Sequence, residues 1–484
     1  MLNPAFIRDL ESALPNGAVI ASREEIRTYE SDGLASYRAS PGIVVLPEST
    51  EQVQAIVRAC DRAQVPFVAR GSGTGLSGGA LPREDGVLIV LARMRRILEI
   101  DIPNQRAIVE PGVINLAVTR EVEPHGYYYA PDPSSQLVCS IGGNVAENSG
   151  GAHCLKYGFT TNHVLGLEVV LPDGTVVHLG GKALDPPGYD LVGAFVGSEG
   201  TLGIATKITL RLLRKPEAVR TLLAAFATTD EAGEAVSQII ADGIVPAAVE
   251  MMDALSIEAA EAAVHAGYPP GAGAVLIVEL DGPATEVEDQ FAAVERICRA
   301  CRSFAIRIAQ DDLERALMWK GRKSAFAAVG RISPDYYVQD GVIPRTALPA
   351  VLRRIADVGR EAALRIANVF HAGDGNLHPL VLYDGSVPGE AQRAEEAAAR
   401  ILEICLEHGG SITGEHGVGV DKKKYMSQMF TADDLNVMQL VRCAFDPRGL
   451  CNPGKLFPTP RLCGEVPGPY RQHPLERAGL AERF

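Results

Sequence analysis

Arg70-Gly-Ser-Gly-Thr-Gly-Leu-Ser-Gly-Gly79 is the stretch of sequence that decides the fold of the N-terminal half. It follows a predicted β-α-β unit, in which strand-like runs at residues 43–46 and 65–69 enclose apolar residues at helical spacing from Val53 to Cys60. Glycine tolerates backbone conformations in which several N–H groups converge on phosphate oxygens. The stretch therefore predicts a loop that binds a phosphate-bearing ligand.

The spacing Gly73-x-Gly75-x-x-Gly78 also matches the fingerprint of nicotinamide-binding Rossmann folds. In those folds the glycines lead into a helix, whereas here Pro82 and a strand-like run at residues 86–91 follow them. A nicotinamide enzyme is therefore the weaker interpretation of this loop. A colourless protein that binds NAD would support it.

Two further regions have the composition of ligand-binding loops. The first joins Ala130-Pro-Asp-Pro-Ser-Ser-Gln136 to residues 140–151, and the second covers residues 197–204. In the first region Ile141 and Val145 alternate with glycines and polar residues, as expected where backbone packs against a flat buried ligand. Three such loops predict one large cofactor.

Size, charge and cysteine content exclude several classes of protein. The length of 484 residues suggests about three structural units, at ~150 residues each. The formal net charge of -14 is spread without a basic block, which argues against a nucleic-acid partner. We expect no signal peptide, because the first thirty residues contain acids and prolines and no uninterrupted apolar core, and no membrane span, because no apolar run reaches about 18 residues. Nine scattered cysteines indicate reduced thiols and a cytoplasmic protein.

The pair Cys298-x-x-Cys301 is the one cysteine spacing that resembles a redox or metal motif. It lacks a second pair and shares a helical pattern with Phe291, Val294 and Ile297, so we expect two cysteines on a helix. An iron–sulfur cluster needs about four cysteine ligands, and no clustered set occurs. We therefore expect no such cluster.

Two histidines flank a turn in His371-Ala-Gly-Asp-Gly-Asn-Leu-His378. Residues 373–376 favour a turn between two strand-like runs. We expect a hairpin in which His371 opposes His378 and Ala372 opposes Leu377. Directly opposed residues point to one face with Cβ atoms about 5 Å apart, so both imidazoles could reach one ion.

A second segment, Gly414-Glu-His-Gly417, adds a carboxylate beside a third histidine. His371, His378 and Glu415 form a two-histidine, one-carboxylate set that suits zinc, with ferrous iron or manganese as alternatives. Such an ion, with an open coordination position, could bind a hydroxyl group and lower its pKa. His416 adjoins a ligand but projects elsewhere, which makes it the candidate general base. We expect structural roles for the other histidines, His125, His153, His163, His178, His265, His408 and His473.

Seven blocks of the sequence resemble the signature segments of one family, and they extend from about residue 40 to residue 457. They are RGSGTGLSGG (70–79), YAPDPSSQLVCSIGGNVAENSGGAHCLKYG (129–158), HVLGLEVVLPDG (163–174), GYDLVGAFVGSEGTLGI (188–204), HAGDGNLHP (371–379), GEHGVG (414–419) and CNPGKLF (451–457). The family is the FAD-linked oxidases of the vanillyl-alcohol oxidase type. The chain most resembles the group of the glycolate oxidase flavin subunit, D-lactate dehydrogenase and D-2-hydroxyglutarate dehydrogenase.

The resemblance implies an α+β fold, with an FAD-binding domain of the vanillyl-alcohol oxidase (PCMH) type and an α+β, ferredoxin-like cap domain. The FAD-binding domain would cover residues 1–215, including a lead-in at 1–38, and the cap domain residues 216–410. Residues 411–460 would return to the FAD-binding domain, and residues 461–484 would form a tail.

FAD is the cofactor that the resemblance implies. Relatives that attach FAD covalently often carry histidine where this chain has Thr74, so we expect non-covalent FAD. The residues that the resemblance assigns to FAD are Arg70, Gly71, Ser72, Gly73, Thr74, Gly75, Gly78, Pro131, Asp132, Ser135, Ser140, Gly142, Gly143, Asn144, Ala146, Ser149, Gly150, Gly151, Tyr157, Glu199, Gly200, Gly203, Ile204 and Asn452.

The reaction implied is oxidation of a D-2-hydroxy acid to a 2-keto acid. The α-hydrogen would pass to the flavin as hydride, His416 would take the hydroxyl proton, and Arg322 and Asn376 would bind the substrate. Lacking a cluster of its own, the protein would need an iron–sulfur subunit, a quinone or another carrier as electron acceptor. The protein could be a homodimer or a subunit of a hetero-complex. It could also associate peripherally with the inner face of the membrane.

The identity of the substrate depends on the strand at 336–340. Relatives that oxidise D-2-hydroxyglutarate often have a lysine there, and this chain has Val338 and Gln339, which favours glycolate or D-lactate. D-2-hydroxyglutarate stays an alternative because Arg345 or Lys323 could bind its second carboxylate. A hypothesis of another class is a non-catalytic flavin-binding subunit of an electron-transfer complex, for which no metal ligands are expected.

Overall fold

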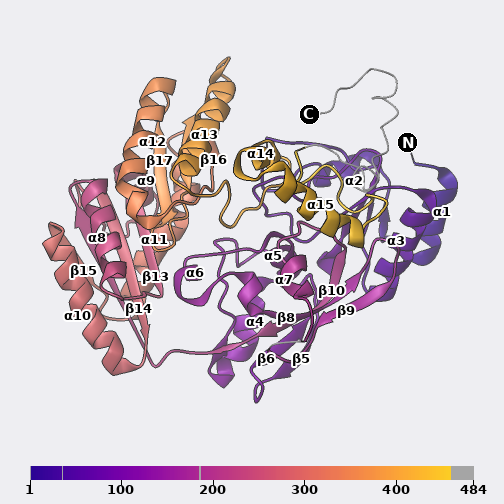
Figure 1. Cartoon of the computed structure of the whole chain (residues 1–484), viewed down its shortest axis with the longest axis horizontal. Coiled ribbons are helices and arrows are strands. Elements are labelled where there is room, and N and C mark those ends of the chain that lie inside the picture. The colour runs from indigo at the N-terminus through magenta and orange to yellow at the C-terminus, as the bar shows by residue number, and fades with distance from the viewer. Residues whose placement is uncertain (1, 35, 185–186, 459–484) are drawn as a thin grey trace.

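The computed structural model describes residues 2–34, 36–184 and 187–458. Figure 1 shows an N-terminal part on one side, a middle part built on one broad sheet on the other, and a C-terminal segment that crosses back over the N-terminal part. Within the described ranges, no helix is long and apolar enough to cross a membrane. The predicted tail at 461–484 lies outside these ranges.

The first sheet of the N-terminal part has the strand order β1-β2-β4-β3, and β2, β4 and β3 are parallel. Ser49 caps the connecting helix by accepting a hydrogen bond from the N–H of Gln52, and Ile56 and Cys60 are buried beneath it. The predicted β-α-β unit is confirmed. The elements of this region are α1 (Pro4–Ala13), β1 (Val19–Ile20), α2 (Arg23–Ile26), β2 (Ile43–Val45), α3 (Thr50–Ala63), β3 (Phe67–Arg70) and β4 (Val87–Val90).

The second sheet is antiparallel, with the strand order β5-β6-β10-β8-β9. One of its covering helices lies in the stretch 140–151, which we predicted to be a loop. Ser140 caps this helix, α5, and Asn148 ends it with a φ of +51°. The glycines at 142 and 143 weaken the helical signal in the sequence. The elements are β5 (Ile97–Asp101), β6 (Arg106–Val109), α4 (Asn115–Val122), β7 (Tyr127–Tyr128), α5 (Ile141–Glu147), α6 (Cys154–Tyr157), β8 (Val164–Val170), β9 (Val176–Gly180), α7 (Leu191–Phe195), β10 (Ile204–Arg211) and β11 (Leu213–Arg214).

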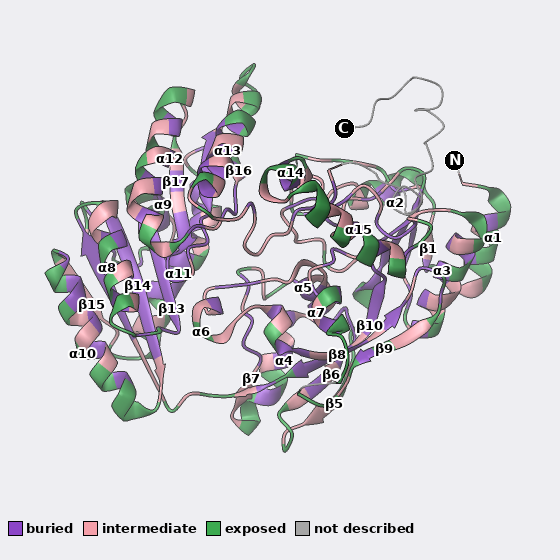
Figure 2. Cartoon of the chain, viewed as in Figure 1, coloured by how far each residue is buried: buried purple, intermediate pink, exposed green. Residues whose placement is uncertain are grey.

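The middle part is a seven-stranded antiparallel sheet with the order β15-β12-β14-β13-β17-β18-β16. Successive residues of β12 point to opposite faces of the sheet: Leu222 and Ala224 belong to the buried apolar cluster that includes residues of α8, α10, α12 and α13, and Leu223 belongs to the cluster that includes residues of α9 and α11. Both faces are therefore covered, and Figure 2 shows the inner strands β13 and β14 as mostly buried. The elements are β12 (Ala218–Phe226), α8 (Thr229–Ala241), β13 (Ala248–Asp253), α9 (Ala254–Val264), β14 (Ala274–Gly282), α10 (Ala284–Ala300), β15 (Ala305–Ile308), α11 (Asp312–Val329), β16 (Asp335–Val338), α12 (Leu348–Ala362), β17 (Ile366–His371), β18 (Pro379–Tyr383) and α13 (Glu390–Glu407).

The C-terminal segment carries the helices α14 (Met426–Met429) and α15 (Ala432–Phe445) and ends beside the first sheet. The N–H of Phe67 donates to the carbonyl of Leu450 at 2.9 Å, and the N–H of Asn452 donates to the carbonyl of Phe67 at 2.8 Å. Residues 450–452 thus lie alongside β3, the strand that delivers the chain into the glycine-rich loop.

The hairpin at 371–378 exists, but its predicted register is wrong by two residues. His371 pairs with Asn376, and the continuation of the β17–β18 ladder places Val369 opposite His378. The turn closes one step earlier than expected because Gly375, with a φ of +80°, lets its own N–H donate to the carbonyl of His371. A shift of two residues keeps both imidazoles on one face of the hairpin.

The predicted reduced thiols are confirmed for seven cysteines, but the prediction is wrong for Cys443, which is disulfide-bonded. Cys60, Cys139, Cys154, Cys298, Cys301, Cys405 and Cys451 are free and buried. Cys298 lies in α10 and Cys301 follows its last residue, which confirms the helical interpretation of that pair. Cys463 lies outside the described residues.

Candidate active site

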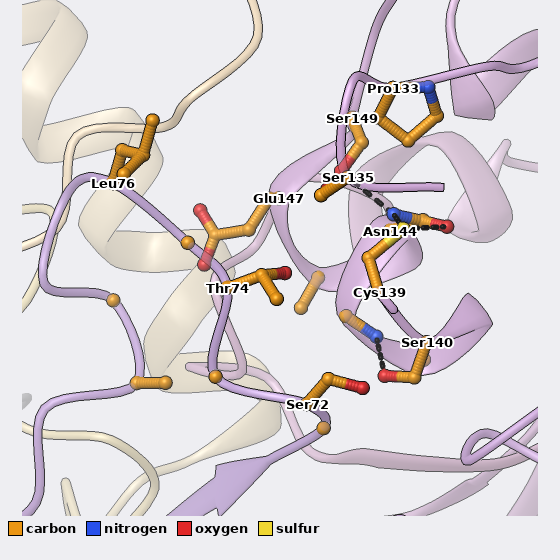
Figure 3. A pocket seen from close by; sticks show the side chains of 18 of the residues that line it. Ser72, Thr74, Leu76, Pro133, Ser135, Cys139, Ser140, Asn144, Glu147 and Ser149 are labelled. Carbon is orange, nitrogen blue, oxygen red and sulfur yellow. Dashed lines mark hydrogen bonds between the residues drawn. The ribbon is translucent and has the colours of Figure 1, made fainter. Parts of the chain in front are cut away.

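A cavity of about 430 Å³ lies where the three predicted loops meet the middle part. Figure 3 shows Ser72, Thr74 and Ser140 among the side chains that line it. Its opposite wall comes from α11, β16 and the segments at 371–378 and 414–417, with Lys323, Tyr336, His378 and His416 among the lining residues. Eighteen of the residues assigned to FAD line it: Arg70, Gly71, Ser72, Gly73, Thr74, Gly75, Ser135, Ser140, Gly142, Gly143, Asn144, Ala146, Ser149, Gly150, Glu199, Gly200, Gly203 and Ile204.

Six residues assigned to FAD do not line this cavity: Gly78, Pro131, Asp132, Gly151, Tyr157 and Asn452. They hold its walls instead. Asn452 donates hydrogen bonds to the carbonyls of Gly79 and Glu199, two lining residues, at 2.9 and 2.6 Å. Tyr157 donates to Asp281 of the middle part at 2.7 Å.

The cavity fits a cofactor held largely by backbone groups. A Cβ atom added at Gly75 would meet no atom within 4 Å, and one added at Gly200 would meet only the Asn452 amide at 3.9 Å. At Gly71, by contrast, it would lie 2.1 Å from Ser140 Oγ, so glycine is required where the first loop approaches α5. The loops therefore pack tightly on each other while leaving backbone open toward the cavity.

The structure brings the three predicted metal ligands together. Glu415 Oε1 lies 3.1 Å from His378 Nε2 and 3.4 Å from His371 Nε2, and one ligand atom from each residue lies within 4.8 Å of the others. The centroids of the two imidazoles are 5.1 Å apart, and their planes are almost perpendicular. Two buried imidazoles converging on one carboxylate fit a divalent ion of the zinc, iron or manganese type.

Asp340, His378 and His416 form a second grouping with similar spacing. Here the carboxylate is already occupied, because Asp340 accepts hydrogen bonds from the backbone N–H groups of residues 414–416 and from Thr413 Oγ1. Lys422 Nζ, also buried, lies 3.2 Å from it. Asp340 therefore anchors the segment that carries Glu415 and His416, and the first grouping is the better ligand set.

The pKa shifts in the cluster favour a charged Glu415 carboxylate and an uncharged His416 imidazole. Burial alone would raise the pKa of Glu415, but the charge and hydrogen bonds of His371 and His378 hold it well below its usual range. Burial lowers the pKa of His416 to about 4, even though Asp340 opposes that shift. The imidazole of His416 is neutral near pH 7, so it can accept a proton. It stacks on His378, with ring centroids 5.0 Å apart.

Comparison with known proteins places the chain in a family. Residues 41–180 match the FAD binding domain family, and residues 215–456 match the family of FAD linked oxidases, C-terminal domain. The chain is 53% identical over 464 residues to glycolate oxidase subunit GlcD of Escherichia coli (strain K12), covering 96% of this chain and 93% of that protein. It belongs to the FAD-linked oxidases. FAD is therefore its cofactor.

More distant relatives of this FAD-linked oxidase agree with that placement. It is 42% identical to glycolate oxidase subunit GlcD of Bacillus subtilis (strain 168), covering 89% of this chain and 92% of that one. A probable mitochondrial D-lactate dehydrogenase of Danio rerio is 32% identical, with 86% and 84% covered. The oxidase thus falls within the glycolate oxidase and D-lactate dehydrogenase group.

Solved structures agree on the fold of the oxidase. A p-cresol methylhydroxylase with substrate bound matches with a TM-score of 0.78 at 18% identity, covering 93% of this chain and 96% of that one. A 4-ethylphenol oxidase from Gulosibacter chungangensis matches with a TM-score of 0.75 at 19% identity, covering 94% and 97%. The predicted fold class, a PCMH-type FAD-binding domain in an α+β chain, is confirmed.

Arg322 lies behind the candidate ligand His371 and does not line the cavity. Its Nη2 is 2.6 Å from Glu250 Oε2, and Glu250 Oε1 lies 2.7 Å from His371 Nδ1. This contact directs His371 Nε2 toward Glu415, as carboxylates commonly do behind metal-binding histidines. Sequence reasoning missed Glu250, because a single acid inside an apolar strand carries no local motif.

Asn376 has a side-chain polar atom that could bind a ligand. It is buried, and its Oδ1 has no hydrogen-bond partner within the described part of the chain. The side chain packs against Gly414, where an added Cβ atom would lie 2.5 Å from its Cγ. Asn376 therefore requires glycine at the first position of the Gly414–Gly417 segment.

Proposed function

We propose that this FAD-linked oxidase oxidises a small D-2-hydroxy acid, such as glycolate or D-lactate, to the 2-keto acid. The observation that carries the proposal is that one cavity is lined by the FAD loops at one end and by His378, Glu415 and His416 at the other. A substrate between them would touch both the cofactor and the proposed base. The names of the relatives, glycolate oxidase subunit and D-lactate dehydrogenase, support the same class of substrate.

The chain supplies one group for each task in the proposed reaction. His371, His378 and Glu415 would hold a divalent ion, zinc or alternatively manganese or iron, which when bound lowers the pKa of a coordinated hydroxyl. The loops at 70–75, 140–150 and 199–204 would hold FAD non-covalently, and FAD would supply the acceptor for the α-hydrogen as hydride. His416 is neutral and adjacent, so it takes the hydroxyl proton. The substrate loses two electrons and two hydrogens, which gives the keto acid.

The substrate would be held by groups around the ligands. Asn376 does not itself line the cavity, but its Oδ1 has no hydrogen-bond partner in the described residues, so it remains a proposed substrate-binding residue. Arg322 remains a proposed carboxylate ligand because its Nε has no hydrogen-bond partner in the described residues, but it would have to share its charge with Glu250. Its main effect through Glu250 would then be to orient His371.

A second candidate substrate is D-2-hydroxyglutarate, and the position of Lys323 favours it. Lys323 lines the cavity with 40% of its side chain exposed, and its Nζ is 4.0 Å from Asp132. An ammonium group in that position could bind a second carboxylate. The absence of a lysine at Val338 or Gln339 favours the monocarboxylates.

An electron acceptor must reoxidise the flavin in this proposal. We propose a separate carrier in the cytoplasm, an iron–sulfur subunit or a quinone, reached in a homodimer or a hetero-complex. The word subunit in the names of the relatives supports a complex. The seven buried free cysteines are spread over the described chain and provide no clustered set for an iron–sulfur centre.

Anaerobic bleaching of the flavin tests the proposal directly. The purified oxidase is mixed without oxygen with glycolate, D-lactate, L-lactate or D-2-hydroxyglutarate, and the loss of oxidised-flavin absorbance is followed. We expect glycolate or D-lactate to bleach it and L-lactate not to. His416→Ala should keep the metal and slow bleaching at least 100-fold, the usual scale of general-base catalysis. The exposed His125→Ala serves as control. If no 2-hydroxy acid bleaches the flavin, the proposal is wrong.

A further inference from the structure

His153 connects the two walls of the cavity. Its Nδ1 lies 2.9 Å from Asp132 Oδ2, and its backbone N–H donates to Asp132 Oδ1 at 3.3 Å. Asp132 comes directly before residues 133–135, which line the cavity on the FAD side. His153 therefore contacts the residue that directly precedes the cavity-lining segment.

The other edge of the imidazole faces the middle part. His153 Nε2 lies 3.3 Å from Glu279 Oε1, and the ring stacks on Trp319 with centroids 5.6 Å apart. Glu279 lies on β14 and Trp319 on α11, so the histidine reaches across from α6 and the loop before it to two elements of the cap side. The contact joins parts of the chain that are far apart in sequence.

Glu279 fixes the orientation of α11. Its buried carboxylate accepts hydrogen bonds from Trp319 Nε1 at 2.7 Å and from Arg315 Nε and Nη2 at 2.8 and 2.6 Å. It also accepts one from Thr221 Oγ1 at 2.7 Å. The same helix presents Lys323, Phe326 and Ala327 to the cavity, about two to three and a half turns after Arg315. The carboxylate thus holds the helix that forms the substrate side of the cavity.

The charges around His153 favour the imidazolium. Each ring nitrogen faces a carboxylate, Asp132 on one side and Glu279 on the other, while Arg315 and Lys323 are the cations nearby. Burial alone would lower the pKa of His153, but Asp132 and then Glu279 raise it to about 10. As an imidazolium it donates from both nitrogens, one hydrogen bond to each wall.

We propose that His153 is a positioning residue that holds the FAD-side loop at 131–135 and helix α11 at a fixed separation, and so determines how tightly the cavity closes around the substrate and FAD. The inference rests on the proposed function for the identity of the substrate. It does not depend on that function for the FAD readouts. His153 touches none of the reacting groups, so its loss should weaken binding more than it slows the chemical step.

The experiment compares His153→Gln with His125→Gln, an exposed histidine of the same FAD-binding part. We expect the KM for the bleaching substrate and the dissociation constant of FAD each to rise about tenfold in H153Q, which is ~1.4 kcal/mol for each. The kcat should change less than twofold. H125Q should match the wild type in all three quantities.

Trp319 provides a readout that is independent of activity, because it is the only tryptophan of the chain. It is 8% exposed and stacked on His153, so loosening of the interface should increase the quenching of its fluorescence by acrylamide. If H153Q does not fold, Asp132→Asn removes the same contact from the other side and is measured in the same way.

The outcomes separate the two proposals. A folded H153Q or D132N with unchanged KM, FAD affinity and Trp319 quenching would overturn the positioning role of His153. If the wild type bleaches with no 2-hydroxy acid but H153Q still loses FAD affinity and gains quenching, the positioning role stands and the proposed function fails. A loss of thermal stability alone, without these changes, would also overturn it, because it would indicate a merely structural contact.

Discussion

Replacing Asp340 with asparagine should detach the segment that carries Glu415 and His416. The Asp340 side chain is fully buried and receives the N–H groups of residues 414–416 at 2.9–3.2 Å, as well as the ammonium of Lys422 at 3.2 Å. Asparagine has the same shape but no charge, and only one of its two terminal atoms can accept hydrogen bonds. The substitution therefore leaves Lys422 buried without its counter-charge.

The magnitude follows from those contacts. Breaking a buried ion pair by removing one partner costs about 3–5 kcal/mol. The N–H groups that lose their acceptor belong to the segment that carries Glu415. Groups that orient metal ligands typically affect metal affinity 10- to 100-fold, so we expect Asp340→Asn to retain less than about a tenth of the wild-type metal. FAD content should be close to the wild-type value, since Asp340 does not line the cavity.

The assay combines metal analysis of the purified protein with denaturant unfolding. Asp289→Asn, an exposed position on α10, serves as the matched control. The double variant Asp340→Asn/Lys422→Met removes the unpaired ammonium as well, so it should be more stable than the sum of the single effects by more than 1 kcal/mol. Full metal content in Asp340→Asn with a stability change below about 1 kcal/mol would refute the anchoring role.

Three further outcomes are expected. Glu250→Gln should weaken metal binding about 10- to 100-fold, because it removes the charge that orients His371, and unchanged metal affinity would contradict this. Glu147 is buried beside Glu199, which accepts the N–H groups of residues 418 and 419; burial and then the charge of Glu199 raise the pKa of Glu147 well above normal. Because Glu147 binds a proton more readily in the folded state, the stability of the wild type should fall as the pH rises above about 4.5. The variant Glu147→Gln should lose this pH dependence. The variant Glu199→Gln should be destabilised by roughly 1.5–3 kcal/mol. Equal pH profiles for the wild type and Glu147→Gln would contradict the assignment. Because Thr74 offers no imidazole for attachment, acid precipitation should release all FAD into the supernatant, and flavin retained on the protein would show a covalent bond elsewhere.

The sequence predicted those parts of the site that have a local pattern. The loop at 70–79, the pair His371 and His378, and Glu415 all lie in glycine-rich turns whose composition is unusual for a structural role. The structure places them at one cavity or one ligand cluster. The predicted pairing of the two histidines was wrong by two residues, but both still lie on one face of the hairpin, because strand side chains alternate with a period of two.

Residues that act through tertiary contacts were missed or misplaced. Asp340 and Glu250 are single acids near or within apolar strands, and their partners come from other elements. Arg322 and Lys323 are adjacent on α11, where one residue step turns the side chain by about 100°, so only the packing of the helix decides which cation reaches the cavity. His153 was expected to be structural because it is a lone histidine in the sequence, and its two carboxylate partners lie too far along the chain to show a motif.

The pairing of residues 450–452 with Phe67 has a consequence for biosynthesis. Asn452 also holds the carbonyls of Gly79 and Glu199, so the FAD cavity gains its last support from residues near the end of the chain. During translation the first sheet emerges long before that support does, and a nascent chain cannot close such a distant contact until it leaves the ribosome. Cofactor loading should therefore be a post-translational event, and an apoprotein pool should accumulate whenever flavin supply lags behind synthesis.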